Sequence, residues 1–312
     1  MPIGTANITI SSLNAEYGKG NNLAAYLGAS VHPVGSIPAT GAISMSLFAA
    51  TSANFISTNI VPSVNVAGGV DIGPTGIVYV VQTGSPAASG AGKLYTYTST
   101  SGLINVTVSP SLVGYPSIAI NQSTGLVYVL ETGASSSPLY SVASDGTRSS
   151  ILATLPTACW RLAINNSGTL YTATSSGSKL LYQINGSTVA QLGSAFSNNL
   201  FAVAVDKNSG TVYVSDTIQI WSVNPTTGTA TSFSGRANIF GLAVDASGNV
   251  YAIEGGTNVS DAKLWCITPA GVGTIIVSGG IHTASNQNVD VSVDQISGKI
   301  YVTGNLGLWL IS

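Results

Sequence analysis

Three carboxylates in the sequence share a spacing that could assemble a ligand site. Glu131, Asp216 and Glu254 each lie three residues after a tyrosine of a recurring pattern. Carboxylate oxygens, completed by water, are ligands that Ca²⁺ accepts in proteins. Bound Ca²⁺ is therefore one hypothesis for these residues, and hydrogen bonding to neighbouring loops or to solvent is the alternative.

The recurring pattern around these residues is a β-hairpin. Residues 239–254 read IFGLAVDASGNVYAIE, in which alternating apolar positions predict two strands, and Asp245 to Gly248 predict the tight turn between them. A period of about 40–50 residues with four short strands is typical of a β-propeller. The sequence therefore predicts an all-β fold, a six-bladed β-propeller. The six repeat tyrosines stand at positions 79, 128, 171, 213, 251 and 301, spaced 49, 43, 42, 38 and 50 residues apart.

The sixth repeat lacks a fourth strand, because the sequence reaches Ser312 directly after its third strand, GLWLI. An unpaired sheet edge invites aggregation. We therefore expect residues 53–64 to supply the missing outer strand, with Phe55, Ile60, Val61 and Val64 as its apolar residues. This expectation assigns residues 53–312 to the propeller and residues 1–52 to a separate segment.

In a propeller, the second strands end on the face where the first strands begin, around the central channel. We expect the three carboxylates on this face, with polar and aromatic neighbours from the adjoining strands. The candidate ligand residues are thus Glu131, Asp216, Glu254, Trp160, Asn199 and Asn238. Packing and loop bonding are the alternative roles for these side chains. No nucleophile–histidine–carboxylate arrangement or zinc spacing is recognisable, so no catalytic residue is predicted.

The composition excludes several classes of function. Only 6% of residues are charged and the net charge is −2, with nine basic residues scattered singly. Nucleic-acid binding needs clustered basic residues, so we expect no nucleic acid partner. No apolar run reaches the length of a membrane span. Cys159 and Cys266 fall on different predicted blades, so we expect free thiols packed as small apolar side chains.

Residues 1–52 do not share the repeat, and they are too short and too glycine-rich to bury a core of their own. We expect this segment to dock on another protein. Packing against the propeller's own flank is the alternative. The apolar anchors would be Leu13, Tyr17, Tyr26, Met45 and Phe48.

The same segment resembles a short N-terminal motif of tailed-bacteriophage and prophage virion proteins, I-S-F-S-D-I-x-x-E-F-G. Three pieces match in order: ITISSLNAEYG at residues 8–18, LAAY at 23–26 and IPATGAISMSLF at 37–48. Ser12 departs from the motif, which has Asp there, and so does Leu47, where Asp or Asn is common. The resemblance implies a virion protein, made in the host cytoplasm and exposed on the particle, with other virion proteins as partners of residues 1–52.

The repeats resemble the six-bladed propellers of the NHL and regucalcin-like group, and VAVDKNSGTVYVSD at residues 203–216 matches their hairpin best. Lactonases of this group bind a divalent metal on the channel face through Glu, Asn and Asp side chains. The resemblance implies that Glu254 could match one such ligand, although no full ligand set can be assigned. Propellers host many functions, so this resemblance indicates the fold more than the activity.

Three functions follow from these observations. The first is a phage structural protein, oligomeric in the particle, whose propeller displays loops for a host-surface glycan or receptor, as in a tail fibre or decoration protein. The second is an enzyme, either a metal-dependent lactonase or a glycan-cleaving propeller. The third is a purely architectural tail or head component. Hydroxyl-rich insertions at residues 84–92 and 255–262 favour recognition by loops on a rigid ring.

Overall fold

A computed structural model describes residues 55–61, 68–82, 92–133, 135–174, 177–255, 262–281, 289–304 and 307–312. The predicted docking residues Leu13, Tyr17, Tyr26, Met45 and Phe48 lie outside these ranges, as do most of the two predicted recognition loops. In the described part of the chain, no helix is long and apolar enough to cross a bilayer.

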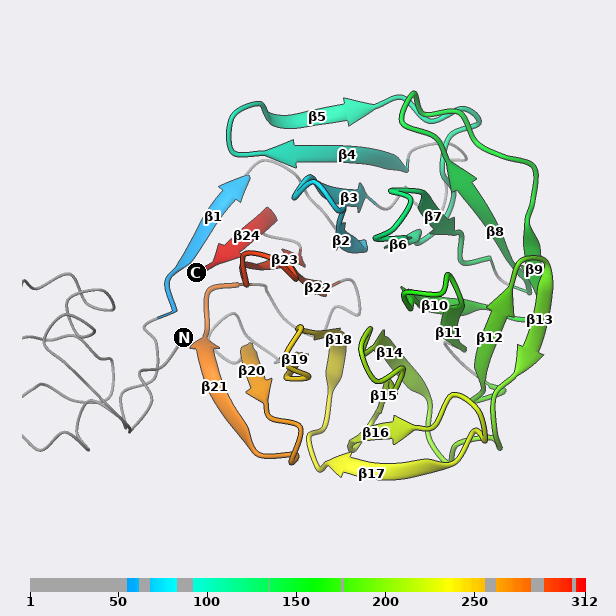
Figure 1. Ribbon diagram of the computed structural model, residues 1–312, viewed down its shortest axis with the longest axis vertical. Coiled ribbons are helices and arrows are strands. Elements are labelled where there is room, and N and C mark those ends of the chain that lie inside the picture. The colour runs from blue at the N-terminus through cyan, green and yellow to red at the C-terminus, as the bar shows by residue number, and fades with distance from the viewer. Residues whose placement is uncertain are drawn as a thin grey trace, which may run out of the picture. The chain divides into compact units, whose positions relative to one another are not determined.

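Six four-stranded antiparallel sheets form a ring around a central channel (Figure 1), which confirms the predicted six-bladed β-propeller. Blade 1 contains β2 (Val70–Ile72), β3 (Val78–Gln82), β4 (Lys93–Thr98) and β5 (Gly102–Val106). Blade 2 contains β6 (Ser117–Ile120), β7 (Val127–Leu130), β8 (Ser137–Val142) and β9 (Ala153–Leu155). Blade 3 contains β10 (Cys159–Ile164), β11 (Leu170–Thr174), β12 (Leu181–Asn185) and β13 (Thr188–Gln191).

The second half of the ring repeats the same order, with the first strand of each blade innermost. Blade 4 contains β14 (Leu200–Val205), β15 (Val212–Asp216), β16 (Ile220–Val223) and β17 (Ala230–Ser234). Blade 5 contains β18 (Ile239–Val244), β19 (Val250–Glu254), β20 (Lys263–Ile267) and β21 (Gly273–Ser278). Blade 6 contains β22 (Asp290–Val293), β23 (Ile300–Gly304), β24 (Gly307–Ile311) and, as its outermost strand, β1 (Ser57–Val61).

Blade 6 therefore joins two distant parts of the chain. β1 runs antiparallel to β24, with Ser57 opposite Ile311 and a register shift between Asn59 and Val61. A Cβ added to Gly307 would come within 2.2 Å of the Val61 carbonyl oxygen, so the two strands approach too closely there for a larger residue. The strand removes the open edge that β24 would otherwise present.

Polar turns build the inner hairpin of each blade, as the sequence pattern predicts. Asp245 Oδ1 accepts hydrogen bonds from the backbone N–H groups of Ser247 at 2.8 Å and Asn249 at 2.9 Å. Gly248 has a φ of 81°, a conformation that glycine adopts without strain. Asp206, the equivalent residue in blade 4, accepts a backbone hydrogen bond in the same way. These side chains cap turns and are not a repeated catalytic set.

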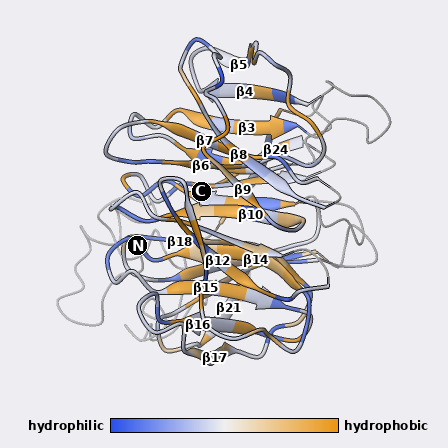
Figure 2. Ribbon diagram, turned by 90° about the vertical axis from the view of Figure 1, so that its right-hand side faces the viewer, coloured by the Kyte–Doolittle hydropathy of each residue, from blue (hydrophilic) through white to orange (hydrophobic). Residues whose placement is uncertain are grey.

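The core of the propeller lies between successive blades. Figure 2 shows hydrophobic residues concentrated along the strands, with hydrophilic residues at the turns. One cluster joins Tyr213 and Ile220 of blade 4 to Val250 and Ile267 of blade 5. Cys159 is buried, Cys266 is half-buried, and both are free thiols, as predicted.

Candidate functional site

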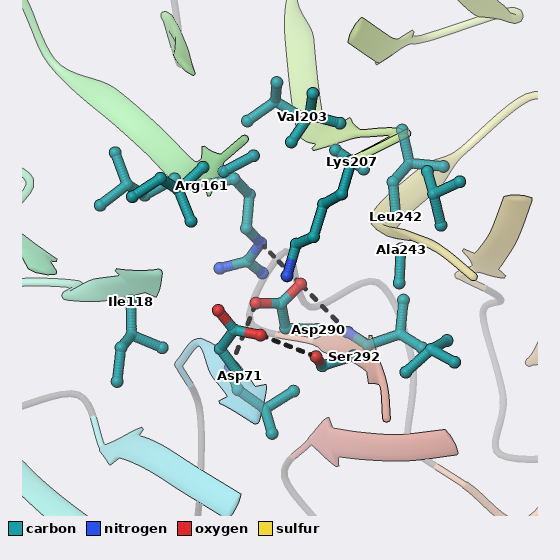
Figure 3. A pocket seen from close by; sticks show the side chains of 18 of the residues that line it. Asp71, Ile118, Arg161, Val203, Lys207, Leu242, Ala243, Asp290 and Ser292 are labelled. Carbon is teal, nitrogen blue, oxygen red and sulfur yellow. Dashed lines mark hydrogen bonds and ion pairs between the residues drawn. The ribbon is translucent and has the colours of Figure 1, made fainter. Parts of the chain in front are cut away.

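The central channel holds the most buried charged groups that line a cavity of this structure. Arg161 from β10 of blade 3 and Asp290 from β22 of blade 6 point toward each other across it (Figure 3). They occupy equivalent positions in the repeat, next to Leu162 and Val291, which pair with the residue after a repeat tyrosine. Blades 3 and 6 are opposite members of the ring, so this pair spans the channel.

Local backbone geometry directs Arg161 into the channel. A β-bulge between Trp160 and Leu162 and a φ of 42° at Arg161 turn its side chain inward. The guanidinium Nε lies 3.7 Å from Asp290 Oδ1. An Nη2–H donates to the Val289 carbonyl at 2.6 Å. The bulge therefore serves to place one cation against the inner strand of the opposite blade.

Asp290 is held on several sides. Its Oδ2 accepts from the Val70 N–H at 3.3 Å and its Oδ1 from the Val291 N–H at 3.0 Å. Burial raises the pKa of Asp290 to about 6, although Arg161 and the two backbone N–H groups act in the opposite direction. Desolvation of the carboxylate thus outweighs its favourable partners.

Asp71 of β2 joins three blades from within the same cavity. Its Oδ1 accepts from the Ser292 hydroxyl at 3.0 Å, and its Oδ2 from the Ile120 N–H at 2.7 Å. The Lys207 side chain extends into the cavity from the turn after β14 (Figure 3). The cavity has a volume of only about 70 Å³, room for a few water molecules but far below the roughly 300–1,000 Å³ of typical ligand sites. The hydrogen bonds of Asp71 and the ion pair of Arg161 with Asp290 can hold the blades together.

Glu131, the first predicted ligand residue, forms an ion pair and a hydrogen bond with residues in and beside blade 2. Its carboxylate forms an ion pair with Arg148, with Oε1 3.1 Å from Nη1 and Oε2 3.2 Å from Nη2. Oε1 also accepts from the Val113 N–H at 3.0 Å. The two charged side chains are 6% and 5% exposed, so both ions are withdrawn from water. The guanidinium stacks 3.7 Å from the centroid of the Tyr140 ring.

Asp216 has a similar set of partners within blade 4. Its Oδ1 accepts from the N–H groups of Ile218 at 2.8 Å and Gln219 at 2.9 Å, which close the turn after β15. Its Oδ2 accepts from the Trp221 indole at 2.9 Å and from the Asn198 amide at 3.2 Å. The carboxylate is fully buried, and its hydrogen bonds lie within its own blade and the segment leading into it.

Glu254 repeats this arrangement in blade 5. Its Oε2 accepts from the Trp265 indole at 2.6 Å, and its Oε1 lies 3.3 Å from the Lys263 ammonium. Glu131, Asp216 and Glu254 thus stand in three different blades with separate partners, and the structure does not bring them together. Among the residues that the structure describes, no group of three or more acidic, histidine or cysteine side chains could hold a metal. A ligand role for the three carboxylates stays a prediction.

The other predicted ligand residues also come from separate blades. Trp160 is half-buried on β10, Asn199 precedes β14, and Asn238, with a φ of 56°, precedes β18. The Asn238 carbonyl accepts from the Gly255 N–H at 2.9 Å. None of the three lines the small channel cavity.

Sequence reasoning missed a second recurring pair, formed between the ends of the second strands and aromatic residues of the third strands. Trp221 and Trp265 donate to Asp216 and Glu254, and the Tyr95 hydroxyl donates to Gln82 at 3.0 Å in blade 1. Gly304 stands at the acceptor position of blade 6, where the Trp309 Nε1 is buried without a partner in the described part of the chain. The fixed aromatic position on the third strand was the available signal.

No family model and no curated protein matches the sequence. Solved structures do match it in shape. The calcium-binding protein regucalcin from Agrobacterium tumefaciens is 15% identical with a TM-score of 0.60, over 82% of this chain and 93% of that chain. The PQQ-bound aldose sugar dehydrogenase from Streptomyces coelicolor is 14% identical with a TM-score of 0.56, over 84% and 99%. A Bacteroides thetaiotaomicron protein of unknown function has a TM-score of 0.63 at 14% identity, over 83% and 76%. At these identities the likeness establishes the propeller fold, with regucalcin-like neighbours, and nothing further.

Proposed function

We propose that this chain is a structural protein of a tailed-phage or prophage particle, with a docking segment at residues 1–52 and a propeller that binds the host surface. The observation that carries the proposal is the virion motif, whose three pieces occur in order within residues 8–48. The six-fold ring complements it, because a rigid scaffold of hairpins can display many loops at fixed positions.

The channel favours a scaffold over an enzyme. In the regucalcin-like alternative, a metal would sit at the channel face, with Glu254 as one ligand. Here the Glu254 carboxylate is shared by Trp265 and Lys263, and the buried Arg161 and Asp290 occupy the channel itself. Only the fold supports the alternative of a metal-dependent lactonase or a glycan-cleaving enzyme. The third candidate, an architectural component, differs only in lacking an external ligand.

Particle assembly tests the proposal. Deleting residues 1–52 should abolish incorporation into particles, and the full-length double variant Tyr17→Ala/Tyr26→Ala should weaken it. Tyr115→Ala is the matched control, because Tyr115 is an exposed tyrosine of the propeller, 40% exposed. The propeller should still bind bacterial cells in a pull-down. Normal assembly of the deletion variant, or release of hydrolysed glycan or lactone by the protein, would overturn the proposal.

A further inference from the structure

A second cavity opens at the boundary between blades 1 and 2. We call it the blade 1–2 cleft, and its walls include Tyr79, Leu94, Val127 and Val142. Its volume is about 690 Å³, within the roughly 300–1,000 Å³ of small-molecule sites. The cleft is therefore large enough for a ring-sized ligand, unlike the channel.

The outer strands of blades 1 and 4 differ beside this cleft. In blade 4, Ile220 pairs with Ser234 and Trp221 with Ser232, which leaves Phe233 as the extra residue of a β-bulge. The Phe233 ring lies 4.8 Å from the Tyr213 ring and packs into the core between blades 4 and 5. Its side chain thus fills the boundary that its blade shares with the next.

β5 of blade 1 is regular instead. Leu94 pairs with Val106, and Tyr95 with Asn105, with no register shift between them. No bulge residue is available to enter the boundary. Tyr79, the counterpart of Tyr213, lines the cleft and is half-buried, whereas Tyr213 is 7% exposed. No other aromatic ring of the described chain packs on Tyr79.

Polar groups surround this apolar floor. The lining includes Thr96 and Thr107 from blade 1 and its exit, with Thr124 and Asp145 from blade 2. Asp145 is exposed, and its Oδ1 accepts from the Thr147 N–H at 2.8 Å. No lysine or arginine is among the lining residues, which disfavours phosphate and other anions.

We propose that the blade 1–2 cleft binds a single sugar ring. The apolar C–H face of a pyranose stacks on Tyr79, in the place that Phe233 holds beside Tyr213, and its hydroxyls bond Asp145 and the hydroxyls of Thr96 and Thr124. The inference rests on the proposed function, because it assigns the propeller's host-surface ligand to the sugars and to one site.

Saturation-transfer NMR on the full chain tests this site, with D-glucose, D-galactose and N-acetyl-D-glucosamine as probes at millimolar concentration. We expect at least one sugar to receive saturation, strongest on one face of its ring. Ile104→Phe should place a ring in the cleft and reduce the signal to background, because Ile104 lines the cleft on the same sheet face as Tyr79. Thr231→Phe is the matched control, because Thr231 holds the equivalent outer-strand position of blade 4, opposite Ser222, at a boundary that is already filled. Asp145→Asn keeps the turn hydrogen bond and should weaken binding roughly tenfold.

The outcomes separate this proposal from the function on which it rests. Absence of transfer to all three sugars overturns the cleft proposal, and the cell pull-down then decides the host-binding function independently. Transfer that survives both Ile104→Phe and Asp145→Asn also overturns it, because the sugar then binds elsewhere while glycan binding itself stands. Should Ile104→Phe fail to fold, the exposed Asp145→Asn variant alone decides.

Discussion

The boundary between blades 4 and 5 and the blade 1–2 cleft are built from the same repeat positions, yet one is filled and the other is open. Tyr213 has the Phe233 ring beside it, whereas Tyr79 packs on the core between blades 1 and 2 and also lines the cleft. One difference between the two blades is the single inserted residue in the outer strand of blade 4. The same repeat can therefore leave a ligand-sized space at one boundary and fill the corresponding space at another.

A second feature is common to both boundaries. Arg236 stacks 3.5 Å from the Trp265 ring centroid and donates to the Gly273 carbonyl at 3.3 Å. Arg148 stacks on Tyr140 and donates to the Pro110 carbonyl at 2.9 Å. At each boundary an arginine thus stacks on an aromatic ring and hydrogen-bonds a backbone carbonyl. These contacts stabilise the segments beside the cleft.

The largest loss of stability should come from removing the Arg148 guanidinium, which stabilises the boundary between blades 1 and 2. Arg148→Met leaves the buried Glu131 carboxylate without its cation, and breaking a buried pair in this way costs about 3–5 kcal/mol. Arg236→Met is the matched control and should cost only about 1 kcal/mol, because its stacking and single carbonyl bond involve no buried carboxylate. Urea unfolding measures both. Equal losses would mean that the two boundaries are fastened with equal strength.

The pH must be held constant in such comparisons, because the contribution of Asp290 in the channel to the free energy of unfolding changes with pH. The native pKa of Asp290 is about 6, above its ordinary value near 4, so the native state holds this proton more tightly than the unfolded chain. Its contribution to stability is full below about pH 4 and falls as pH rises to about 6, by roughly 3 kcal/mol.

The free energy of unfolding, measured across this range for the wild type and for Asp290→Asn, reports the effect. The difference between the two proteins should shift against the wild type as pH rises and become constant above about pH 7. A difference that does not vary with pH would mean that Asp290 is ionised throughout.

The next largest loss of stability should come from removing the Phe233 ring at the boundary between blades 4 and 5. Phe233 is half-buried, so Phe233→Ala should cost about 2 kcal/mol, less than the roughly 3–5 of a fully buried phenylalanine. It should also open a cleft beside Tyr213, which an increase in quenching of tyrosine fluorescence by acrylamide can detect. A stability equal to wild type would show that Phe233 contributes nothing to this boundary.

The outcome at these sites shows which features were readable from sequence. Asp245 and Gly248 predicted their hairpin because a turn is a local event, and the tyrosine spacing predicted the ring because each blade repeats it. The pairing of Arg161 with Asp290 was not readable, since the two residues stand in opposite blades and no local pattern relates them. The partners of Asp216 and Glu254 depend on strand register, which places Trp221 and Trp265 beside them.

The smallest expected effect is the most direct test of the comparison. Ile104→Phe introduces into blade 1 the kind of side chain that Phe233 supplies in blade 4, at an exposed position on the same sheet face as Tyr79. Burying the new ring against Tyr79 gains apolar contact, offset by the ordering of one side chain. Thermal unfolding should therefore show a change between zero and about 1 kcal/mol in favour of the variant. A loss above about 2 kcal/mol would mean that the regular β5 cannot direct a ring inward, and that the open boundary reflects strand geometry instead of a missing side chain.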